Sequence, residues 1–501
     1  MLAPQNGVEQ LLGAQALARH GHRVALSGAE DVTYAELADR VARASGALQQ
    51  LGVRAGERVL ILMRDTPEFA AAWLGAVRLG AVAVALNTKL SEADYRHILA
   101  DSAARLVVVE DVFAHTRPDL TGELARVRRI AIAGRGARGV PAWRDLVKAA
   151  GPVAAHPATA DTPAFYLYSS GTTGKPKGIV HAHRSFGVVG GALRLLGLDE
   201  GARVFTTSKF FFAYVLEHGL LGPLAIGATS VLCADWPDAQ AVLEIAARTR
   251  PIALFSVPTL YRRLLAEPAD RLAPLRAIRY LVSAGERLSP ALHEQWRRVA
   301  GGELLNLYGM SETFCACIVT PPGTSDGRAT GAPLAGVDVE LRDGVLWVRH
   351  PSLSPGYVNL PERSREVFRD GWFCTNDLFE QEPGGRLVHV GRADDLVKIA
   401  GQWVHPLEIE EAVGSLEAVA EAVCVTAPDS DALERLALFI VPRGDAATAL
   451  AAAQAACELA LPRHRRPKWI RALAELPRTA TGKVQRFRLR ELLVGEEAGK
   501  G

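Results

Sequence analysis

A segment of eleven residues, from Tyr168 to Gly178, combines side chains that suit a phosphate group. It contains three glycines, four serine or threonine hydroxyls and two lysines, and it follows an apolar, strand-like run. Glycines let successive backbone N–H groups turn toward one anion, hydroxyls add donors, and lysines add positive charge. An exposed glycine-rich turn is the alternative interpretation. The pattern predicts phosphate binding by Ser169, Ser170, Gly171, Thr172, Thr173, Gly174 and Lys177.

This segment differs from the P-loop, whose pattern G-x-x-x-x-G-K-[ST] opens directly into a helix. Here Pro176 follows Lys175. A proline disfavours helix at the residue before it, so Lys175 is expected in an extended or turn segment. A loop of this kind can close over a triphosphate.

The segment resembles the phosphate loop of the acyl-adenylate-forming enzymes, a superfamily of acyl-CoA ligases, carrier-protein adenylation domains and luciferases. Five further segments match the superfamily in the same order, so that the resemblance covers roughly residues 30 to 490. It implies an acid–thiol ligase that uses ATP and CoA as cosubstrates and Mg²⁺ as its metal ion.

Two of these segments, which begin at Ser283 and Asn306, stand at the ends of strand-like runs. Ligands of open α/β sheets bind beyond the carboxyl ends of the strands. Small residues there let a planar base lie against the backbone, and Tyr308 offers it an aromatic face. Glu312 supplies a hard oxygen ligand for Mg²⁺, with Thr172 as the second predicted ligand. The nucleotide-binding residues implied here are Ala284, Gly285, Glu286, Asn306, Leu307, Tyr308, Gly309, Met310 and Ser311.

Asp377 ends the segment Trp-Phe-Cys-Thr-Asn-Asp, which resembles the Thr-Gly-Asp of the family. The resemblance implies that its carboxylate accepts from both ribose hydroxyls, as an acidic residue does in dinucleotide-binding folds. Asn376 replaces the usual glycine, and asparagine is one of the few residues that tolerate positive φ.

Residues 391–398, Gly-Arg-Ala-Asp-Asp-Leu-Val-Lys, resemble the linker of the family. Arg392 is then expected at the ribose or the α-phosphate, and Lys398 at the nucleotide. Asp394 is expected at the hinge about which the C-terminal domain turns between adenylation and thioester formation. Gly401 would line the passage for the pantetheine arm of CoA.

Lys483 ends the last matching segment, Pro-Arg-Thr-Ala-Thr-Gly-Lys. The resemblance assigns it to adenylation, where a lysine touches the substrate carboxylate and the α-phosphate and compensates the charge that develops. The catalytic residues implied are therefore Lys483, Glu312, Arg392 and Asp394.

Residues 209–214, Lys-Phe-Phe-Phe-Ala-Tyr, bear on the identity of the acid. They resemble the Phe-Phe-Ala-Tyr of benzoate–CoA ligases, which implies an aryl pocket; an aromatic core strand is the alternative for the phenylalanines. Benzoate ligases usually place a histidine just past Tyr-Gly-x-x-Glu, where this chain has Cys315 and Cys317. A thiol frees volume and removes a donor, so a ring-substituted benzoate is expected, such as an amino-, hydroxy- or halobenzoate. The predicted substrate residues are Ala213, Tyr214, Gly285, Gly309 and Cys315.

Three other functions share parts of this pattern. An adenylation enzyme that loads a carrier protein would perform the same first half-reaction, but no carrier domain follows Lys483. A luciferase-like oxygenase is disfavoured. A non-catalytic nucleotide-binding module is the most disfavoured, because the chain has the full set of Glu312, Asp377, Arg392 and Lys483. The predicted function is an aryl-CoA ligase that forms an acyl-AMP, with loading of a carrier protein as the alternative.

The composition is that of an average globular enzyme. Of 501 residues, 49% are hydrophobic and 22% are charged, and 57 Lys and Arg nearly balance 55 Asp and Glu. The net charge of +2 favours neither nucleic acid nor a membrane surface. Six cysteines without C-x-x-C spacing predict reduced thiols, and the first residues lack a signal-peptide pattern. A cytoplasmic enzyme is expected, with an aromatic carboxylate, ATP and CoA as its partners and a homodimer as a candidate assembly.

A chain of this length predicts two or more domains. Strand-like runs alternate with helical periodicity, so parallel sheets covered by helices are expected. Asp343-Gly344 between two short runs predicts a hairpin over residues 340–348. The strands are expected at residues 58–63, 81–86, 106–110, 230–233, 253–257 and 280–283.

The C-terminal part has a different pattern, in which helices are expected at residues 406–416 and 446–456 and strands at residues 419–425 and 436–441. The predicted fold class is therefore α/β. A large N-terminal domain, residues 1–393, has parallel-rich sheets and an antiparallel, barrel-like element. A small mobile α+β domain, residues 394–501, is hinged at Asp394.

Overall fold

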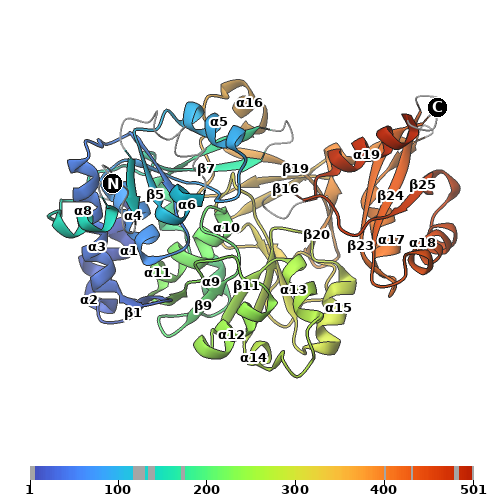
Figure 1. The fold of residues 1–501 in the computed structure, drawn as a ribbon, viewed down its shortest axis with the longest axis horizontal. Helices are drawn as coiled ribbons and strands as arrows, with labels where there is room; N and C mark the ends of the chain where they lie inside the picture. The colour runs from blue at the N-terminus through green and yellow to red at the C-terminus, as the bar shows by residue number, and fades with distance from the viewer. Residues whose placement is uncertain are drawn as a thin grey trace. The chain divides into compact units, whose positions relative to one another are not determined.

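The computed structural model describes residues 6–116, 130–133, 142–170, 175–399, 402–429, 433–478 and 484–498. Contacts divide the chain into two compact units. The first comprises residues 1–288, 292–340 and 347–374, and the second comprises residues 289–291, 341–346 and 375–501. Figure 1 gives the labels of the helices and strands.

A six-stranded sheet in the first unit carries the phosphate-binding segment at its edge. Its order is β6-β5-β3-β4-β7-β8, and all neighbours are parallel except β7 and β8. The central strands are continuous apolar runs, as expected where both faces are covered. The strands are β3 (Arg58–Leu62), β4 (Val82–Ala85), β5 (Leu106–Glu110), β6 (Ile130–Ala133), β7 (Pro163–Ser170) and β8 (Pro176–Ala182).

A nine-stranded sheet carries the two nucleotide segments, in the order β15-β14-β13-β12-β11-β9-β10-β1-β2. The strands from β13 to β1 are parallel, and antiparallel strands close both ends. Its strands are β1 (Val24–Ser27), β2 (Asp31–Thr33), β9 (Arg203–Thr206), β10 (Thr229–Val231), β11 (Ala253–Ser256), β12 (Tyr280–Ala284), β13 (Leu304–Tyr308), β14 (Ile318–Val319) and β15 (Ala332–Pro333).

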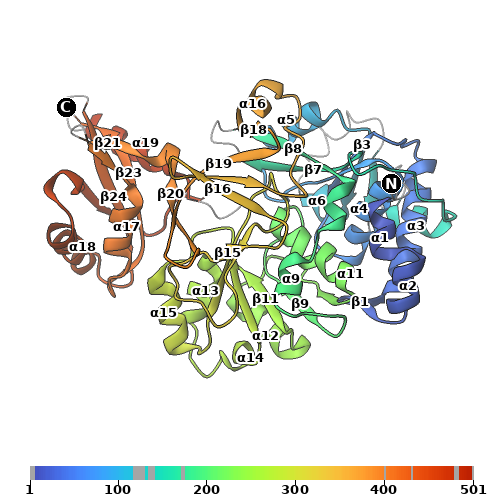
Figure 2. The same ribbon diagram turned by 180° about the vertical axis from the view of Figure 1, so that it is seen from behind.

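Helices cover both faces of the nine-stranded sheet. Apolar side chains of α12, α13, α14 and α15 pack on one face, and α9 packs on the other (Figure 1 and Figure 2). The helices of this part are α9 (Gly191–Leu195), α10 (Ala213–Leu216), α11 (Gly222–Ile226), α12 (Ala239–Thr249), α13 (Pro258–Leu265), α14 (Ala273–Arg276) and α15 (Pro290–Val299).

Local sequence explains where the N-terminal helices begin. Thr33 and Glu36 form a capping box at the start of α3, each side chain bonding the backbone N–H of the other. Thr66 caps α4, which has proline at its first position. The helices are α1 (Gly7–Leu12), α2 (Ala14–His20), α3 (Tyr34–Gln50), α4 (Pro67–Arg78), α5 (Glu92–Ser102), α6 (Asp111–Thr116) and α8 (Trp143–Ala149).

A five-stranded sheet has the order β16-β17-β19-β18, with β20 paired to β19. Asp343 and Gly344, both with positive φ (51° and 78°), form the turn of the predicted hairpin. The elements are β16 (Asp338–Arg342), β17 (Val345–Arg349), α16 (Pro361–Val367), β18 (Phe368–Arg369), β19 (Trp372–Gln381) and β20 (Leu387–Arg392).

The C-terminal part of the second unit is a three-stranded sheet, β23-β24-β25, between helices. Alternate residues of β24 face opposite sides: Leu436, Leu438 and Ile440 lie in one apolar cluster, and Ala437 and Phe439 in another. The elements are β21 (Val397–Ile399), β22 (Gln402–Val404), α17 (Pro406–Gly414), β23 (Val419–Pro428), β24 (Glu434–Pro442), α18 (Ala446–Ala460), β25 (Trp469–Ala472) and α19 (Arg486–Ala498).

The predicted α/β class, with parallel-rich sheets in a large N-terminal part and a smaller α+β C-terminal part, is confirmed. Within the described part of the chain, no helix is long and apolar enough to span a membrane.

Candidate active site

The phosphate-binding segment joins two antiparallel strands. Ser169 pairs with Lys177 and Ser170 with Pro176 across β7 and β8, and Lys175 lies in a bend, as the following proline predicted. The carbonyl oxygen of Pro176 lies 2.7 Å from Nε2 of His97. The remaining predicted residues, Gly171, Thr172, Thr173 and Gly174, lie outside the described residues.

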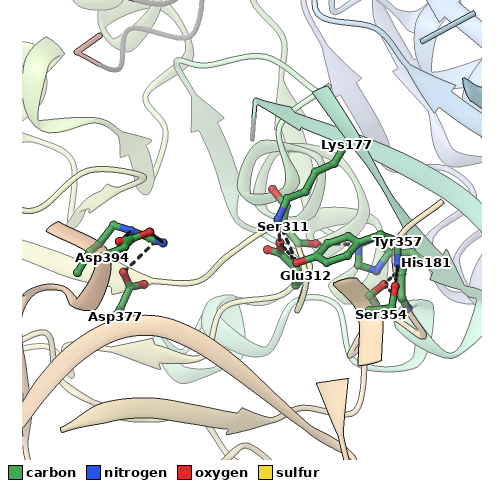
Figure 3. A network of polar contacts seen from close by, with 11 residues as sticks. Lys177, His181, Ser311, Glu312, Ser354, Tyr357, Asp377 and Asp394 are labelled. Carbon is green, nitrogen blue, oxygen red and sulfur yellow. Dashed lines mark hydrogen bonds and ion pairs between the residues drawn. The ribbon is translucent and has the colours of Figure 1, made fainter. Parts of the chain in front are cut away.

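Lys177 and Glu312, predicted as phosphate and metal ligands, meet directly. Nζ of Lys177 lies 2.9 Å from Oε1 of Glu312, which also accepts from the hydroxyl of Tyr357 at 2.8 Å (Figure 3). Nζ further donates to the Tyr357 oxygen at 3.0 Å and lies 4.2 Å from the ring centroid. Burial, and then the Glu312 charge, raise the pKa of Tyr357. Sequence reasoning missed Tyr357, because its partners are far away along the chain.

The backbone next to Glu312 is held by a buried histidine. Nε2 of His181 donates to the carbonyl oxygen of Ser311 at 2.8 Å, and the imidazole stacks on Phe165. Burial lowers the pKa of His181 to about 4, so the ring is neutral at neutral pH. The contact positions Ser311 by its backbone and leaves its hydroxyl side chain for other partners.

The two nucleotide segments lie side by side at the carboxyl ends of parallel strands. Ala284 of β12 is paired with Leu307 of β13, so Gly285 and Tyr308 follow at the same edge. Gly285 has a φ of 79°, and a Cβ there would lie 3.9 Å from the Tyr214 ring. The structure therefore brings a nucleotide segment and the substrate segment together.

Other members of the two segments hold the same edge in place. The carboxylate of Glu286 accepts from the Thr259 hydroxyl at 2.9 Å, and the Met310 carbonyl accepts from the backbone N–H of Phe314 at 3.1 Å. The backbone N–H of Asn306 donates to the Thr320 hydroxyl at 3.1 Å.

The aromatic segment divides between the core and the site. Phe210 and Phe211 are buried in the core, in a turn rather than in the strand considered as the alternative. Ala213 and Tyr214 begin α10 and remain half-buried, and the Tyr214 hydroxyl donates to Oγ of Ser208 at 2.9 Å.

The remaining predicted substrate residues, Gly309 and Cys315, lie close to each other. A Cβ at Gly309 would lie 3.4 Å from the carbonyl oxygen of Cys315. Cys315 is buried, and burial raises the pKa of its thiol well above the ordinary value, so the side chain is a neutral apolar surface. Phe314 before it has a φ of 62°, which is uncommon for a bulky residue.

In the second unit, Arg392 joins two of the predicted carboxylates. Its guanidinium binds both oxygens of Asp394 at 2.8 and 3.0 Å and lies 3.3 Å from Oδ1 of Asp377 (Figure 3). Although burial opposes it, the net effect of these contacts is to lower the pKa of Asp394. Asn376 has a φ of 62°, the conformation for which glycine is best suited and which asparagine tolerates. Lys398 lies on β21, whereas Gly401 and Lys483 lie outside the described residues.

Comparisons with known proteins agree with this arrangement. A model of the AMP-binding enzyme family matches residues 13–358, and a model of the AMP-binding enzyme C-terminal domain matches residues 408–483. The chain is 40% identical to a 3-hydroxybenzoate–CoA ligase of Aromatoleum sp. (strain CIB), over 97% of both chains. It is 36% identical to a benzoate–CoA ligase of Thauera aromatica, over 97% of this chain and 95% of the relative.

Solved structures give the same result. The anthranilate CoA ligase AuaEII in complex with anthranoyl-AMP is similar with a TM-score of 0.90 and 30% identity, over 99% of each chain. A benzoate CoA ligase from Burkholderia xenovorans LB400 is similar with a TM-score of 0.88 and 32% identity, over 97% of this chain and 100% of the other.

The chain belongs to the family of AMP-binding enzymes, because both family models match it. The paired ends of β12 and β13 and the contact of Lys177 with Glu312 agree with this class. The two relatives named above are ligases of an aromatic acid and CoA. The predicted membership of the acyl-adenylate-forming superfamily, in its aryl-CoA ligase branch, is confirmed.

Proposed function

We propose that the chain is an ATP-dependent aryl-CoA ligase that converts a ring-substituted benzoate to its CoA thioester through an acyl-AMP, with release of AMP and pyrophosphate. One observation carries the proposal. The ring of Tyr214, in the segment that resembles benzoate ligases, lies against Gly285 of a nucleotide segment. An aromatic acid beside Tyr214 would therefore lie next to the predicted nucleotide site.

The residues of the first unit divide the work as follows. Lys177 and the loop before it bind the phosphates, and Tyr308 and the glycines around it bind the base. In the structure Lys177 is neutralised by Glu312. Bound phosphates compete for this ammonium group, so ATP binding exchanges one charge pair for another.

The carboxylate of Glu312 fits the role of a magnesium ligand. Among the described residues, it accepts hydrogen bonds from Lys177 and Tyr357, both at Oε1. No group of three acidic, histidine or cysteine side chains that could cage a metal occurs among the described residues. Mg²⁺ is commonly held by one or two carboxylates plus substrate phosphates. When bound there by Glu312, and by Thr172 of the loop, it would neutralise phosphate charge.

The second unit supplies the groups of the two half-reactions. Asp377 accepts from the ribose hydroxyls, Arg392 contacts the ribose or the α-phosphate, and Lys483 compensates charge during adenylation. The domain that begins at residue 394 then turns about Asp394, removes Lys483 and admits CoA past Gly401. The domain boundary, this hinge, a homodimer and a cytoplasmic location stay predictions from the sequence.

A hydroxybenzoate is the favoured acid. The relative with 40% identity is named for 3-hydroxybenzoate, and Cys315 is a buried thiol in the apolar cluster against which Tyr214 packs. A hydroxyl on the ring needs additional space, and a thiol at this position leaves more space than the usual histidine.

The test is a pyrophosphate-release assay with and without CoA, with masses of the products. The acids are benzoate, its 3- and 4-hydroxy, 2-amino and 4-chloro derivatives, phenylacetate and octanoate. A substituted benzoyl-CoA as the main product supports the proposal. Pyrophosphate release without a CoA thioester would point to a carrier protein as acceptor, and preference for octanoate would refute the aryl pocket.

A further inference from the structure

The helix that carries Tyr214 continues into a π-helix that places two polar side chains in the apolar interior. The π-helical turn runs from Glu217 to Leu221, directly after α10. The exposed fractions are 1% for Glu217 and 0% for His218. π-Helical turns are rare and occur frequently at functional sites. Neither side chain was singled out from the sequence.

The hydrogen bonds of His218 define which of its nitrogens can accept. Nδ1 lies 2.7 Å from the carbonyl oxygen of Tyr214, and a carbonyl can only accept, so Nδ1 carries the hydrogen. Oε2 of Glu217 lies 3.0 Å from the same Nδ1. In the neutral imidazole Nε2 is then an acceptor. This atom is buried, and no donor reaches it from any residue that the structure describes.

His218 adjoins the segment of the proposed aryl wall. It follows Tyr214 by four residues, and its ring packs on Phe255 of β11 with centroids 4.6 Å apart. The strand β11 leads to Val257, whose Cγ1 would lie 3.7 Å from a Cβ at Gly285. The imidazole is thus held between the segment of Tyr214 and the strand next to the nucleotide edge.

Glu217 connects the same region to Cys315. After burial, the Glu217 charge is the largest contribution that raises the pKa of the Cys315 thiol. Its Oε1 lies 3.4 Å from the backbone N–H of Gly190, and its Oε2 lies on the Nδ1 side of His218. Glu217 therefore acts as a positioning residue by its charge: the carboxylate lies close to Nδ1 without a hydrogen bond to it, and favours a hydrogen on that nitrogen.

We propose that Nε2 of His218 accepts a hydrogen bond from a donor substituent on the ring of the bound acid, a hydroxyl or an amino group. A buried acceptor without a donor is unfavourable, so a substrate that supplies the donor is preferred over one of equal size that cannot. His218 thus selects hydroxy- and aminobenzoates against halobenzoates. This inference rests on the proposed aryl-CoA ligase function and narrows its substrate class.

The test compares kcat/KM for 3-hydroxy-, 3-amino-, 3-fluoro- and 3-methoxybenzoate and for the corresponding 4-substituted acids. For the wild type, kcat/KM is expected to be higher for a hydroxy- or aminobenzoate than for the fluoro- and methoxybenzoates substituted at the same position. The expected ratio is about tenfold or more, which is the loss for one unmade hydrogen bond. The two donor arms show which group is the natural one. Equal turnover of donor and non-donor acids by the wild type would overturn the proposal without any variant.

His218→Asn is the informative substitution, because its amide nitrogen can replace Nδ1 as donor to the Tyr214 carbonyl while nothing replaces Nε2. It is expected to lose the preference for donor acids by about tenfold while kcat/KM for the fluoro acid changes about threefold or less. His293→Asn is the matched control, because this buried histidine bonds Ser325 in another part of the unit. The His293→Asn variant is expected to keep the wild-type preference for donor acids.

The outcomes separate the two proposals. A wild type that ligates benzoates, with the same preference in His218→Asn, overturns the role of His218 and leaves the proposed function intact. A wild type that ligates no benzoate overturns both.

Discussion

Lys209 forms a buried ionic cluster just before the aromatic segment. Its Nζ donates to the carbonyl oxygens of Cys233 and Asp235, both at 2.6 Å, and lies 3.8 Å from Oδ2 of Asp65. Oδ1 of Asp65 accepts from the backbone N–H of Phe210 at 3.2 Å. The side chains of Lys209 and Asp65 are 3% and 7% exposed. Replacing Lys209 by methionine keeps the length of the side chain and removes the ammonium group.

The expected loss of stability is large. The substitution leaves a buried carboxylate without its cation and two carbonyls without their donor. Removal of one partner of a buried ion pair costs about 3–5 kcal/mol. At about 2–4 °C of Tm per kcal/mol for large domains, Tm should fall by roughly 6–20 °C.

The loss should also depend on pH. Burial raises the pKa of Asp65 to about 7, and the Lys209 charge opposes this rise. The folded chain binds more protons than the unfolded chain between the unfolded pKa of 3.8 and about 7, so the contribution of Asp65 to stability falls as pH rises through this window. Without Lys209 the folded pKa is higher, and the decline continues to higher pH. Lys209→Met is therefore more destabilising at about pH 8 than at about pH 5.

Thermal unfolding of four proteins at these two pH values tests the reasoning: the wild type, Lys209→Met, Asp65→Asn and the double variant. Asp65→Asn is the matched control, because its amide oxygen still accepts from Phe210 and it carries no charge. The double variant should regain the pH-dependent part of the loss. The reasoning is refuted by a Lys209→Met loss below about 1 kcal/mol, far under that of a broken buried pair, by equal losses at both pH values, or by no recovery in the double variant.

Three further predictions concern the active site. Lys483→Ala should abolish pyrophosphate release from the free acid and spare thioester formation from supplied acyl-AMP; loss of both activities would contradict the assignment. Asn376→Val should cost at least about 1–2 kcal/mol, the penalty of the left-handed conformation, whereas Asn376→Gly should leave Tm nearly unchanged; equal effects in a thermal scan would argue against strain. Glu312→Gln should lower kcat for adenylation by about 100-fold, as loss of one charge-stabilising group does. If the variant and the wild type had the same rate at every Mg²⁺ concentration of a titration, Glu312 would be excluded as a ligand.

The sequence by itself determined features that depend on neighbouring residues. The capping box of Thr33 and Glu36 begins α3, and Asp343-Gly344 turns the hairpin, because both structures are made by bonds within a few residues. Asn376 tolerates its positive φ for an equally local reason. The family motifs also lie at the predicted strand ends, since the apolar runs before them form the buried parallel strands β12 and β13.

Only the tertiary structure decided which distant groups meet. Lys177 contacts Glu312 across 135 residues and Tyr357 across 180 residues, and no local pattern records such partners. The pair of Lys209 and Asp65 is also invisible to any local pattern. The acceptor at Nε2 of His218 likewise exists only because the π-helical turn places Nδ1 against the Tyr214 carbonyl inside the core. Hydrogen bonds and charges between remote segments depend on how the sheets are assembled, and burial makes their free energies large enough to define the site.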